Sequence, residues 1–176
     1  MAGSAGNQYK SIIFDLDGTL TDPRIGITSC VRHALLSAGI QEGDIGKLLP
    51  YIGPPLARSF REFHGLTPVQ VEKAILDYRE RFSTLGMYEN EVYTGIPEML
   101  RVLKEQGFFL ALATSKLEIY AIDILKHFAL DSFFDFIAGS LRDGSRSEKG
   151  DVIRHVIQST GFQLEETLMV GDTKEA

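Results

Sequence analysis

Two carboxylates stand one residue apart at the end of an apolar stretch. The apolar run 12–14 leads directly into Asp15, and Asp17 follows after a single leucine. An unbroken apolar run is typical of a strand buried on both faces, where an uncompensated carboxylate is costly. In open α/β sheets, ligands bind just outside the carboxyl ends of the strands. We therefore interpret Asp15 and Asp17 as candidates for a nucleophile, a proton carrier or cation ligands.

A plainer interpretation of this stretch is a strand-to-turn junction in which Asp and Gly only form the turn. Polar residues at two further predicted strand ends favour a site instead. Thr114 and Ser115 follow the apolar run 108–113, and Gly171 and Asp172 follow the run 167–170. If these strands are parallel and neighbouring, their carboxyl ends meet at one edge of the sheet.

Lys149 is the fourth candidate. It lies in the first turn of a helix that we expect to begin after Ser147, where the helix dipole disfavours a cation by about 0.3–1 kcal/mol. A lysine in this position is expected to have an anionic partner. The alternative is a solvated lysine beside Glu148 and Asp151.

The remaining pattern predicts the elements that position these residues. Beyond Gly95, helices and strands alternate, which indicates β-α-β connections and a parallel sheet. The expected helices are 96–107, 117–129 and 150–160, and the expected strands are 108–113, 133–138 and 167–170. We therefore predict an α/β fold with a Rossmann-like core.

The stretch between the first strand and this repeat is predicted to be helical. Apolar residues recur at helical spacing over 27–38, and Thr67-Pro68 begins a second helix with a capping box to Gln70. Between them, the loop 48–56 contains Gly53-Pro54-Pro55, which a helix interior excludes. We expect a discontinuous core of residues 7–22 and 92–176 and an α-helical cap of residues 23–91. Hinges are expected near 22–26 and 93–95.

Residues 15–19, Asp-Leu-Asp-Gly-Thr, resemble the first motif of the haloacid dehalogenase superfamily, which reads Asp-x-Asp-Gly-Thr. Thr114 at a strand end, Lys149 ahead of the last strand and Gly171-Asp172 after it resemble the later motifs, in the same order. The resemblance implies a HAD-like core and an aspartyl-phosphate intermediate. It implies Mg²⁺ as cofactor, with Asp15, Asp17 (through its backbone carbonyl) and Asp172 as metal ligands.

The same resemblance implies a role for each candidate residue. Asp15 is the nucleophile, and Asp17 is first the general acid and then the base. Thr114, Ser115 and Lys149 bind the substrate phosphate, and Lys149 also offsets the charge on Asp15. Asp17 indicates phosphate esters as substrates, because ion-pumping ATPases have Lys-Thr after the nucleophile and dehalogenases lack the second aspartate.

The predicted cap resembles that of the phosphoglycolate phosphatase-like branch, and residues 52–56 and Thr114-Ser115-Lys116 resemble two of its motifs. The resemblance implies a phosphatase acting on a small phosphate monoester. A β-phosphoglucomutase-like sugar phosphomutase, a 5'-nucleotidase and a catalytically idle binding or regulatory protein are the alternatives. Arg24 and Arg58 are candidates to contact a second anionic group. The loop Gly53-Pro54-Pro55 is either a rigid connector or a substrate-facing segment.

Composition excludes several other classes of protein. The 176 residues are 44% hydrophobic and 24% charged, with a net charge of −6, which provides no basic field for nucleic acid or an anionic membrane. Without an apolar run long enough for a membrane span or a signal peptide, we expect a cytoplasmic protein. Cys30 is expected to pack in a helix, and the histidines at 33, 64, 127 and 155 to be surface or structural.

The N-terminal end of the chain is expected to precede the core, and the C-terminal end to stop before the core is complete. Residues 1–6 resemble a flexible arm or a tag remnant. Cores of this capped type usually continue past the Gly-Asp motif with another strand and helix, and often with a second acidic residue four or five positions beyond the aspartate. We therefore expect the C-terminal part of the core to lie beyond Ala176.

Overall fold

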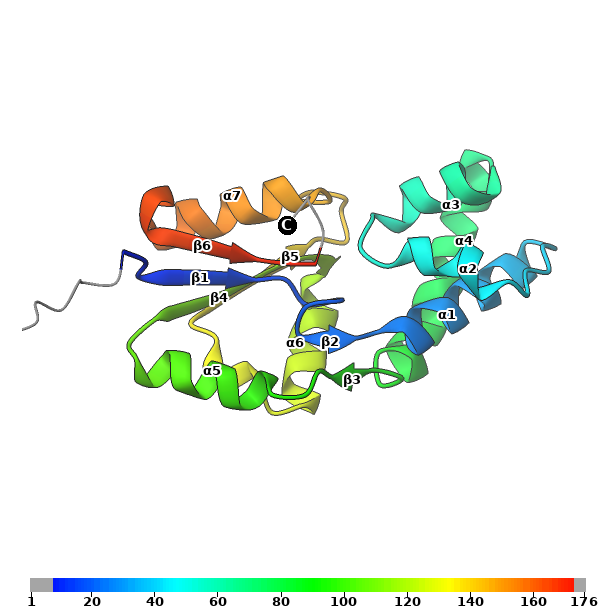
Figure 1. The fold of residues 1–176 in the computed structure, drawn as a ribbon. Coiled ribbons are helices and arrows are strands. Elements are labelled where there is room, and N and C mark those ends of the chain that lie inside the picture. The colour runs from blue at the N-terminus through cyan, green and yellow to red at the C-terminus, as the bar shows by residue number, and fades with distance from the viewer. Residues whose placement is uncertain (1–7, 173–176) are drawn as a thin grey trace, which may run out of the picture.

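The computed structural model of the chain describes residues 8–172. Its centre is a four-stranded parallel sheet in the order β5-β4-β1-β6 (Figure 1). The strands are β1 (Ser11–Phe14), β4 (Phe109–Leu117), β5 (Phe136–Ser140) and β6 (Thr167–Val170). The predicted α/β class with a Rossmann-like parallel sheet is confirmed. The 1–6 arm and the continuation beyond residue 172 lie outside the described residues.

Three helices cover the sheet. α7 (Lys149–Thr160) lies on one face, and α5 (Ile96–Glu105) and α6 (Glu118–His127) lie on the other (Figure 1). Successive strand residues point to opposite faces, and the core divides accordingly. Ile13, Ala111 and Ala113 pack with Val152 and Val156 of α7. The other cluster contains Ile12, Phe14, Leu110 and Leu112, together with Leu100, Ile124 and Leu125 of α5 and α6.

A helical insert of residues 24–86 lies beyond the carboxyl ends of the strands (Figure 1). It contains α1 (Arg24–Ser37), α2 (Ile45–Leu48), α3 (Leu56–His64) and α4 (Pro68–Arg81), followed by a π-helical turn (Phe82–Gly86). α4 begins as predicted, because the Thr67 side chain accepts from the Gln70 backbone while Gln70 accepts from the Thr67 backbone. α1 packs against α4 and forms the body of the insert.

Two short strands connect the insert to the sheet. β2 (Thr21–Asp22) and β3 (Glu91–Val92) pair antiparallel, so the two crossings of the chain run side by side. The predicted boundaries at 22/23 and 91/92 fall at this ribbon. The ribbon itself was not predicted, because strands of two residues are too short to produce a hydrophobic pattern.

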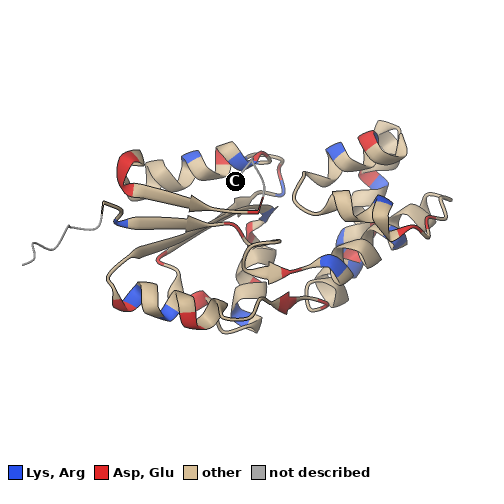
Figure 2. Cartoon of the chain, in the orientation of Figure 1, with Lys and Arg blue, Asp and Glu red and all other residues tan. Residues whose placement is uncertain are grey.

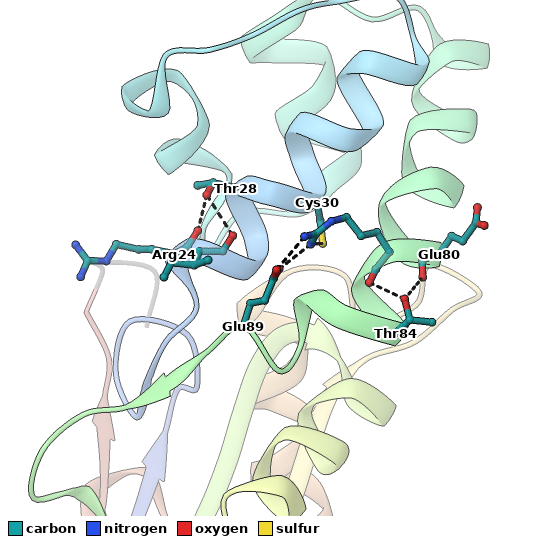
Figure 3. Close-up of polar contacts among 8 residues, drawn as sticks. Arg24, Thr28, Cys30, Glu80, Thr84 and Glu89 are labelled. Atoms are coloured by element: carbon teal, nitrogen blue, oxygen red, sulfur yellow. Dashed lines mark hydrogen bonds and ion pairs between the residues drawn. The ribbon is translucent and has the colours of Figure 1, made fainter.

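The base of the insert is held by a close backbone contact and by one ion pair, which Figure 3 shows at Glu89. A Cβ at Gly26 would lie 2.0 Å from the Gly86 carbonyl oxygen, and one at Gly86 would lie 2.4 Å from Cys30 Sγ. Arg81 donates to both carboxylate oxygens of Glu89 at 2.7 and 2.9 Å and to Cys30 Sγ at 3.2 Å. Burial raises the pKa of the Cys30 thiol. Cys30 therefore packs in a helix, as expected.

The structure corrects three predicted elements. β4 continues through Thr114 and Ser115 to Leu117, although its pairing with β5 shifts register after Ala113, so the polar residues mark an irregularity and not the end of the strand. The loop 48–56 is helical up to Tyr51. The expected strand 133–138 begins only at Phe136, because 131–133 form a 3₁₀ turn. Apolar runs alone do not distinguish a strand from an apolar turn.

Charged residues lie mainly on the helices and at the strand ends, and the strands themselves are nearly free of them (Figure 2). This distribution is expected of a sheet covered on both faces. Among residues 8–172, no helix combines the length and the apolar character required to cross a bilayer.

Candidate active site

Asp15 lies at the carboxyl end of β1 and is only 6% exposed. Lys149 Nζ lies 2.5 Å from Asp15 Oδ2 and also donates to the Ala113 carbonyl at 3.2 Å. The other carboxylate oxygen of Asp15 accepts from the Leu16 backbone at 2.7 Å. The charge that burial makes costly is therefore compensated by the lysine at the start of α7. Asp15 is therefore the anionic partner that the position of Lys149 predicts.

Asp17 is also buried, and its two oxygens differ. Oδ2 lies 2.9 Å from Lys116 Nζ, while Oδ1 is buried and has no hydrogen-bond partner within residues 8–172. Burial raises the pKa of Asp17, although the neighbouring Lys116 opposes this shift. A carboxyl group with a raised pKa and a free oxygen is suited to deliver a proton to a reacting group.

Lys116 also belongs to the site, although the sequence pattern alone does not predict its contact with Asp17. In the sequence it is the last residue of the Thr114-Ser115-Lys116 motif. The available signal was a lysine two residues beyond Thr114, on a strand whose neighbour ends in two carboxylates. A strand places residues i and i+2 on the same face, so Lys116 and Thr114 point the same way only where the pleat is regular. Because the register of β4 shifts after Ala113, the spacing alone does not predict that Lys116 faces Asp17.

Gly18 allows the last carboxylate to approach the first motif. Its φ of +82° lies in the left-handed region, and a Cβ there would lie 2.2 Å from Asp172 Oδ2. Any other residue at position 18 would be strained and would also displace the Asp172 side chain. The glycine of the first motif and the aspartate of the last are thus linked by direct packing.

The charged side chains of the site line one cavity of about 300 Å³, which we call the reaction cavity. It brings together all six predicted catalytic, phosphate-binding and metal residues: those that follow β1 and β6, those at the irregularity in β4, and Lys149 at the start of α7. Residues 52–54 of the insert form its opposite wall. The complete lining is Asp15, Asp17, Ile52, Gly53, Pro54, Thr114, Ser115, Lys116, Lys149 and Asp172.

The reaction cavity has a donor set suited to a hard cation. Mg²⁺ takes oxygen ligands and is commonly bound by one or two carboxylates, with waters and substrate phosphate completing the shell. Asp15 and Asp172 supply carboxylates, and glycine at position 18 leaves space for the latter. Within residues 8–172, no group of three or more His, Cys, Asp or Glu side chains is arranged as a metal site. The residues therefore fit a cation shared with substrate better than a cation caged by protein.

The two candidate arginines each lie close to an acidic side chain. Arg24 is bound to Asp22 through Nε at 2.8 Å and is largely exposed, and Arg58 Nη1 lies 3.7 Å from Glu148 Oε2. Neither is among the residues that line the reaction cavity. By contrast, Gly53 and Pro54 do line it, so the loop faces the cavity as one of its two interpretations predicts.

The histidines have structural contacts or lie on the surface. The Tyr51 hydroxyl is 2.8 Å from His64 Nδ1, and the His127 ring packs against Tyr88 with a centroid distance of 4.9 Å. His155 packs against Phe136, and His33 is exposed. These positions agree with the expectation that the four histidines are surface or structural residues.

Comparison with family models decides the classification. The haloacid dehalogenase-like hydrolase model matches residues 12–175, nearly the whole chain and all of the reaction cavity. The chain belongs to the haloacid dehalogenase-like hydrolase family. The predicted family and its HAD-like fold are thereby confirmed.

Named relatives of this haloacid dehalogenase-like hydrolase include a 5'-nucleotidase from Pseudomonas aeruginosa, 47% identical over 168 residues. The match covers 96% of this chain and 76% of that relative. Tyrosine-protein kinase PtkA from Mycobacterium tuberculosis is 42% identical over 173 residues, with 97% of this chain and 58% of that protein covered. The chain therefore spans about three-fifths to three-quarters of these relatives.

Solved structures agree with the assignment to the haloacid dehalogenase-like hydrolases. The crystal structure of a predicted phosphatase from Clostridium acetobutylicum matches with a TM-score of 0.92 and 42% identity, covering 95% of this chain and 77% of that one. A haloacid dehalogenase-like hydrolase from Streptococcus pneumoniae matches with a TM-score of 0.86 and 32% identity, covering 96% and 78%.

Proposed function

We propose that this haloacid dehalogenase-like hydrolase is a Mg²⁺-dependent phosphatase that hydrolyses a small phosphate monoester through an aspartyl phosphate on Asp15. The observation that carries the proposal is that one cavity contains two carboxylates in different electrostatic environments. Asp15 is held as an ion pair with Lys149 at 2.5 Å, whereas Asp17 has a raised pKa and one unpartnered oxygen. One carboxylate is suited to attack and the other to carry a proton.

In the first half of the proposed reaction, an Asp15 carboxylate oxygen attacks phosphorus and the bond from phosphorus to the ester oxygen breaks. The proton on Asp17 passes to that leaving oxygen, which departs as an alcohol. Lys149, Thr114 and Ser115 hold the transferring phosphoryl oxygens, and the Lys149 charge offsets the repulsion between carboxylate and phosphate.

In the second half, water attacks the phosphorus of the aspartyl phosphate. Asp17, now ionised, accepts the water proton, and the bond from phosphorus to Asp15 breaks. Inorganic phosphate leaves, Asp15 is regenerated as a carboxylate, and Asp17 is protonated for the next cycle. Each proton that Asp17 gives is thus returned by the attacking water.

Asp15, Asp172 and the Asp17 backbone carbonyl would hold Mg²⁺ in this proposal. Bound there, the cation would neutralise phosphate charge, as metal ions do in phosphoryl transfer. The relatives support phosphate-ester chemistry by name: besides the 5'-nucleotidase, they include phosphoglycolate phosphatases from Agrobacterium fabrum and Aquifex aeolicus, 30% and 29% identical. We assign this chain to the phosphoglycolate phosphatase-like branch because its helical insert and residues 52–56 resemble the cap of that branch.

The test is phosphate release from a panel of phosphate monoesters, with Mg²⁺ and with EDTA. We expect Mg²⁺-dependent turnover that Asp15→Asn abolishes while the variant remains folded, which circular dichroism checks. Asp77→Asn is the matched control, because Asp77 is a carboxylate on α4 paired with Lys73, away from the reaction cavity. Equal turnover by the Asp15→Asn variant would contradict the mechanism.

The same panel separates the phosphatase from its alternatives. Turnover that requires a phosphorylated sugar activator would indicate a phosphomutase. If the folded protein releases phosphate from none of the esters in the presence of Mg²⁺, a binding or regulatory role is indicated. We expect neither, because the proposed nucleophile, proton carrier and phosphate-binding residues lie together in one cavity.

A further inference from the structure

A second cavity opens beside the reaction cavity. It has a volume of about 280 Å³ and lies between the insert and the sheet. Five residues line both cavities: Asp17, Gly53, Pro54, Ser115 and Lys116. Asp17, the proposed proton donor to the leaving oxygen, therefore stands at the boundary between the two spaces.

Aromatic side chains form the wall of this second cavity. Tyr78 and Phe82 are stacked, with centroids 5.4 Å apart and ring planes within 13° of parallel. Phe82 in turn contacts Tyr120 at 5.3 Å. Tyr78 and Phe82 come from the insert and Tyr120 comes from α6 of the core, so both parts of the fold build the wall. Tyr51 lines the cavity as well.

One side chain connects this wall to the proton donor. Lys116 Nζ lies 4.4 Å from the centroid of the Phe82 ring and 2.9 Å from Asp17 Oδ2. The remaining cations lie on the more exposed lining, at Arg79 and Arg142. The cavity thus has an aromatic wall next to the reacting centre and a polar rim.

We propose that this second cavity, here called the aromatic chamber, seats a planar aromatic ring of the leaving alcohol, so that ring-bearing phosphate monoesters are the preferred substrates. The inference rests on the proposed function for its reaction, but ring binding itself needs no catalysis. With phosphorus at Asp15 and the leaving oxygen at Asp17, the rest of the alcohol has to pass Asp17, and the aromatic chamber borders it there.

Size and chemistry both support a ring. An apolar protein cavity of about 150 Å³ accommodates benzene, so a chamber of about 280 Å³ has room for a ring and the atoms that carry it. Stacked and edge-on aromatic contacts favour a flat π-system over an aliphatic group of the same size. A two-carbon alcohol such as glycolate would leave most of the aromatic wall without contact.

The first test compares kcat/KM for three esters: phenyl phosphate, a nucleoside 5'-monophosphate and phosphoglycolate, which has no ring. We expect kcat/KM for at least one of the two ring-bearing esters to exceed kcat/KM for phosphoglycolate by about tenfold or more. A factor of this size corresponds to one stacking contact between rings. Preference for phenyl phosphate places the ring one bond from the leaving oxygen, and preference for the nucleotide places it on a sugar. Equal or better turnover of phosphoglycolate overturns the inference.

Two variants probe the aromatic chamber directly. Phe82→Leu removes the central ring of the wall, and Ala57→Phe adds bulk at a half-buried lining position. Each should lower the ratio of kcat/KM for the preferred ring ester to that for phosphoglycolate by about tenfold. Tyr88→Ala is the control: Tyr88 is an exposed aromatic packed on His127 and is not among the lining residues. An unchanged ratio in both chamber variants overturns the inference.

A binding measurement separates this inference from the proposed function. Saturation-transfer NMR with phenol and with a nucleoside, the two ring-bearing alcohols, is expected to show contact in the wild-type chain and in Asp15→Asn, and a loss of contact in Ala57→Phe. Ring binding without turnover of any ester would overturn the proposed phosphatase and uphold the aromatic chamber. Turnover without ring preference and without ring binding would uphold the proposed phosphatase and overturn the aromatic chamber.

Discussion

Lys116 Nζ lies 2.9 Å from Asp17 Oδ2, and both side chains are about nine-tenths buried. The same ammonium group lies over the ring of Phe82, which belongs to the helical insert. The proposed proton carrier is therefore oriented by a core lysine that is itself packed against the insert.

We expect Lys116→Met to lower kcat by about tenfold or more, because Asp17 loses the donor that fixes Oδ2. A double-mutant cycle with Asp17→Asn, measured by denaturant unfolding, should give a coupling free energy of about 0.5–3 kcal/mol, the range for residues in direct contact. Lys47→Met serves as the control, since Lys47 is an exposed lysine paired with Glu42. Additive effects in the Lys116 and Asp17 cycle would contradict the contact.

Lys149→Met should be more severe than Lys116→Met. It leaves the buried Asp15 carboxylate without its cation, and breaking a buried pair costs about 3–5 kcal/mol of unfolding free energy. Phosphate release should fall to the background rate. Lys149→Arg, measured in parallel, should recover part of the stability because the charge is kept. A Lys149→Met protein as stable as wild type would show that Lys149 does not compensate Asp15.

Gly18→Ala and Gly39→Ala form a matched pair. Both glycines have φ near +80°, but a Cβ at Gly39 meets no atom within 4 Å, whereas one at Gly18 overlaps the Asp172 carboxylate. Each variant should lose about 1–2 kcal/mol from the left-handed backbone alone. Only Gly18→Ala should also weaken Mg²⁺ binding, measured by calorimetry, and reduce turnover. Equal Mg²⁺ affinity in the two variants would exclude Asp172 as a ligand.

His64 makes the stability of the insert depend on pH. Burial lowers the pKa of His64 below its usual 6.5, although the nearby Glu42 opposes the shift. As pH falls through about 6.5, the unfolded chain binds a proton that the folded chain resists, so the contribution of His64 to stability should decrease below that pH and be constant above it. Urea unfolding between pH 5 and 8 measures this slope.

His64→Gln should flatten this part of the stability profile while lowering stability at pH 8, because the contact of the Tyr51 hydroxyl with His64 Nδ1 at 2.8 Å is lost. His33→Gln, at an exposed position on α1, is the control and should keep the slope of the wild-type profile. A wild-type slope in His64→Gln would assign the pH dependence to other groups.

Much of the fold and the site was predictable because the signals are local. An apolar run before Asp15 predicted a buried strand, and the alternation after Gly95 predicted a parallel sheet. Parallel strands bring their carboxyl ends together whatever the loops between them do, so Asp15, Thr114 and Asp172 were expected to meet. The unfavourable position of Lys149 at a helix start predicted an anionic partner, which the structure identifies as Asp15.

By itself, then, the amino-acid sequence determined the α/β class, the family and six residues of the reaction cavity, since each depends on a residue type, a short spacing or the direction of a strand. Only the tertiary structure decided that Lys116 contacts Asp17, that Arg24 and Arg58 do not line the reaction cavity, and that Tyr78, Phe82 and Tyr120 form one wall. These relationships join residues distant in the chain. They depend on a register shift in β4 and on how the insert packs over the sheet, which no local pattern records.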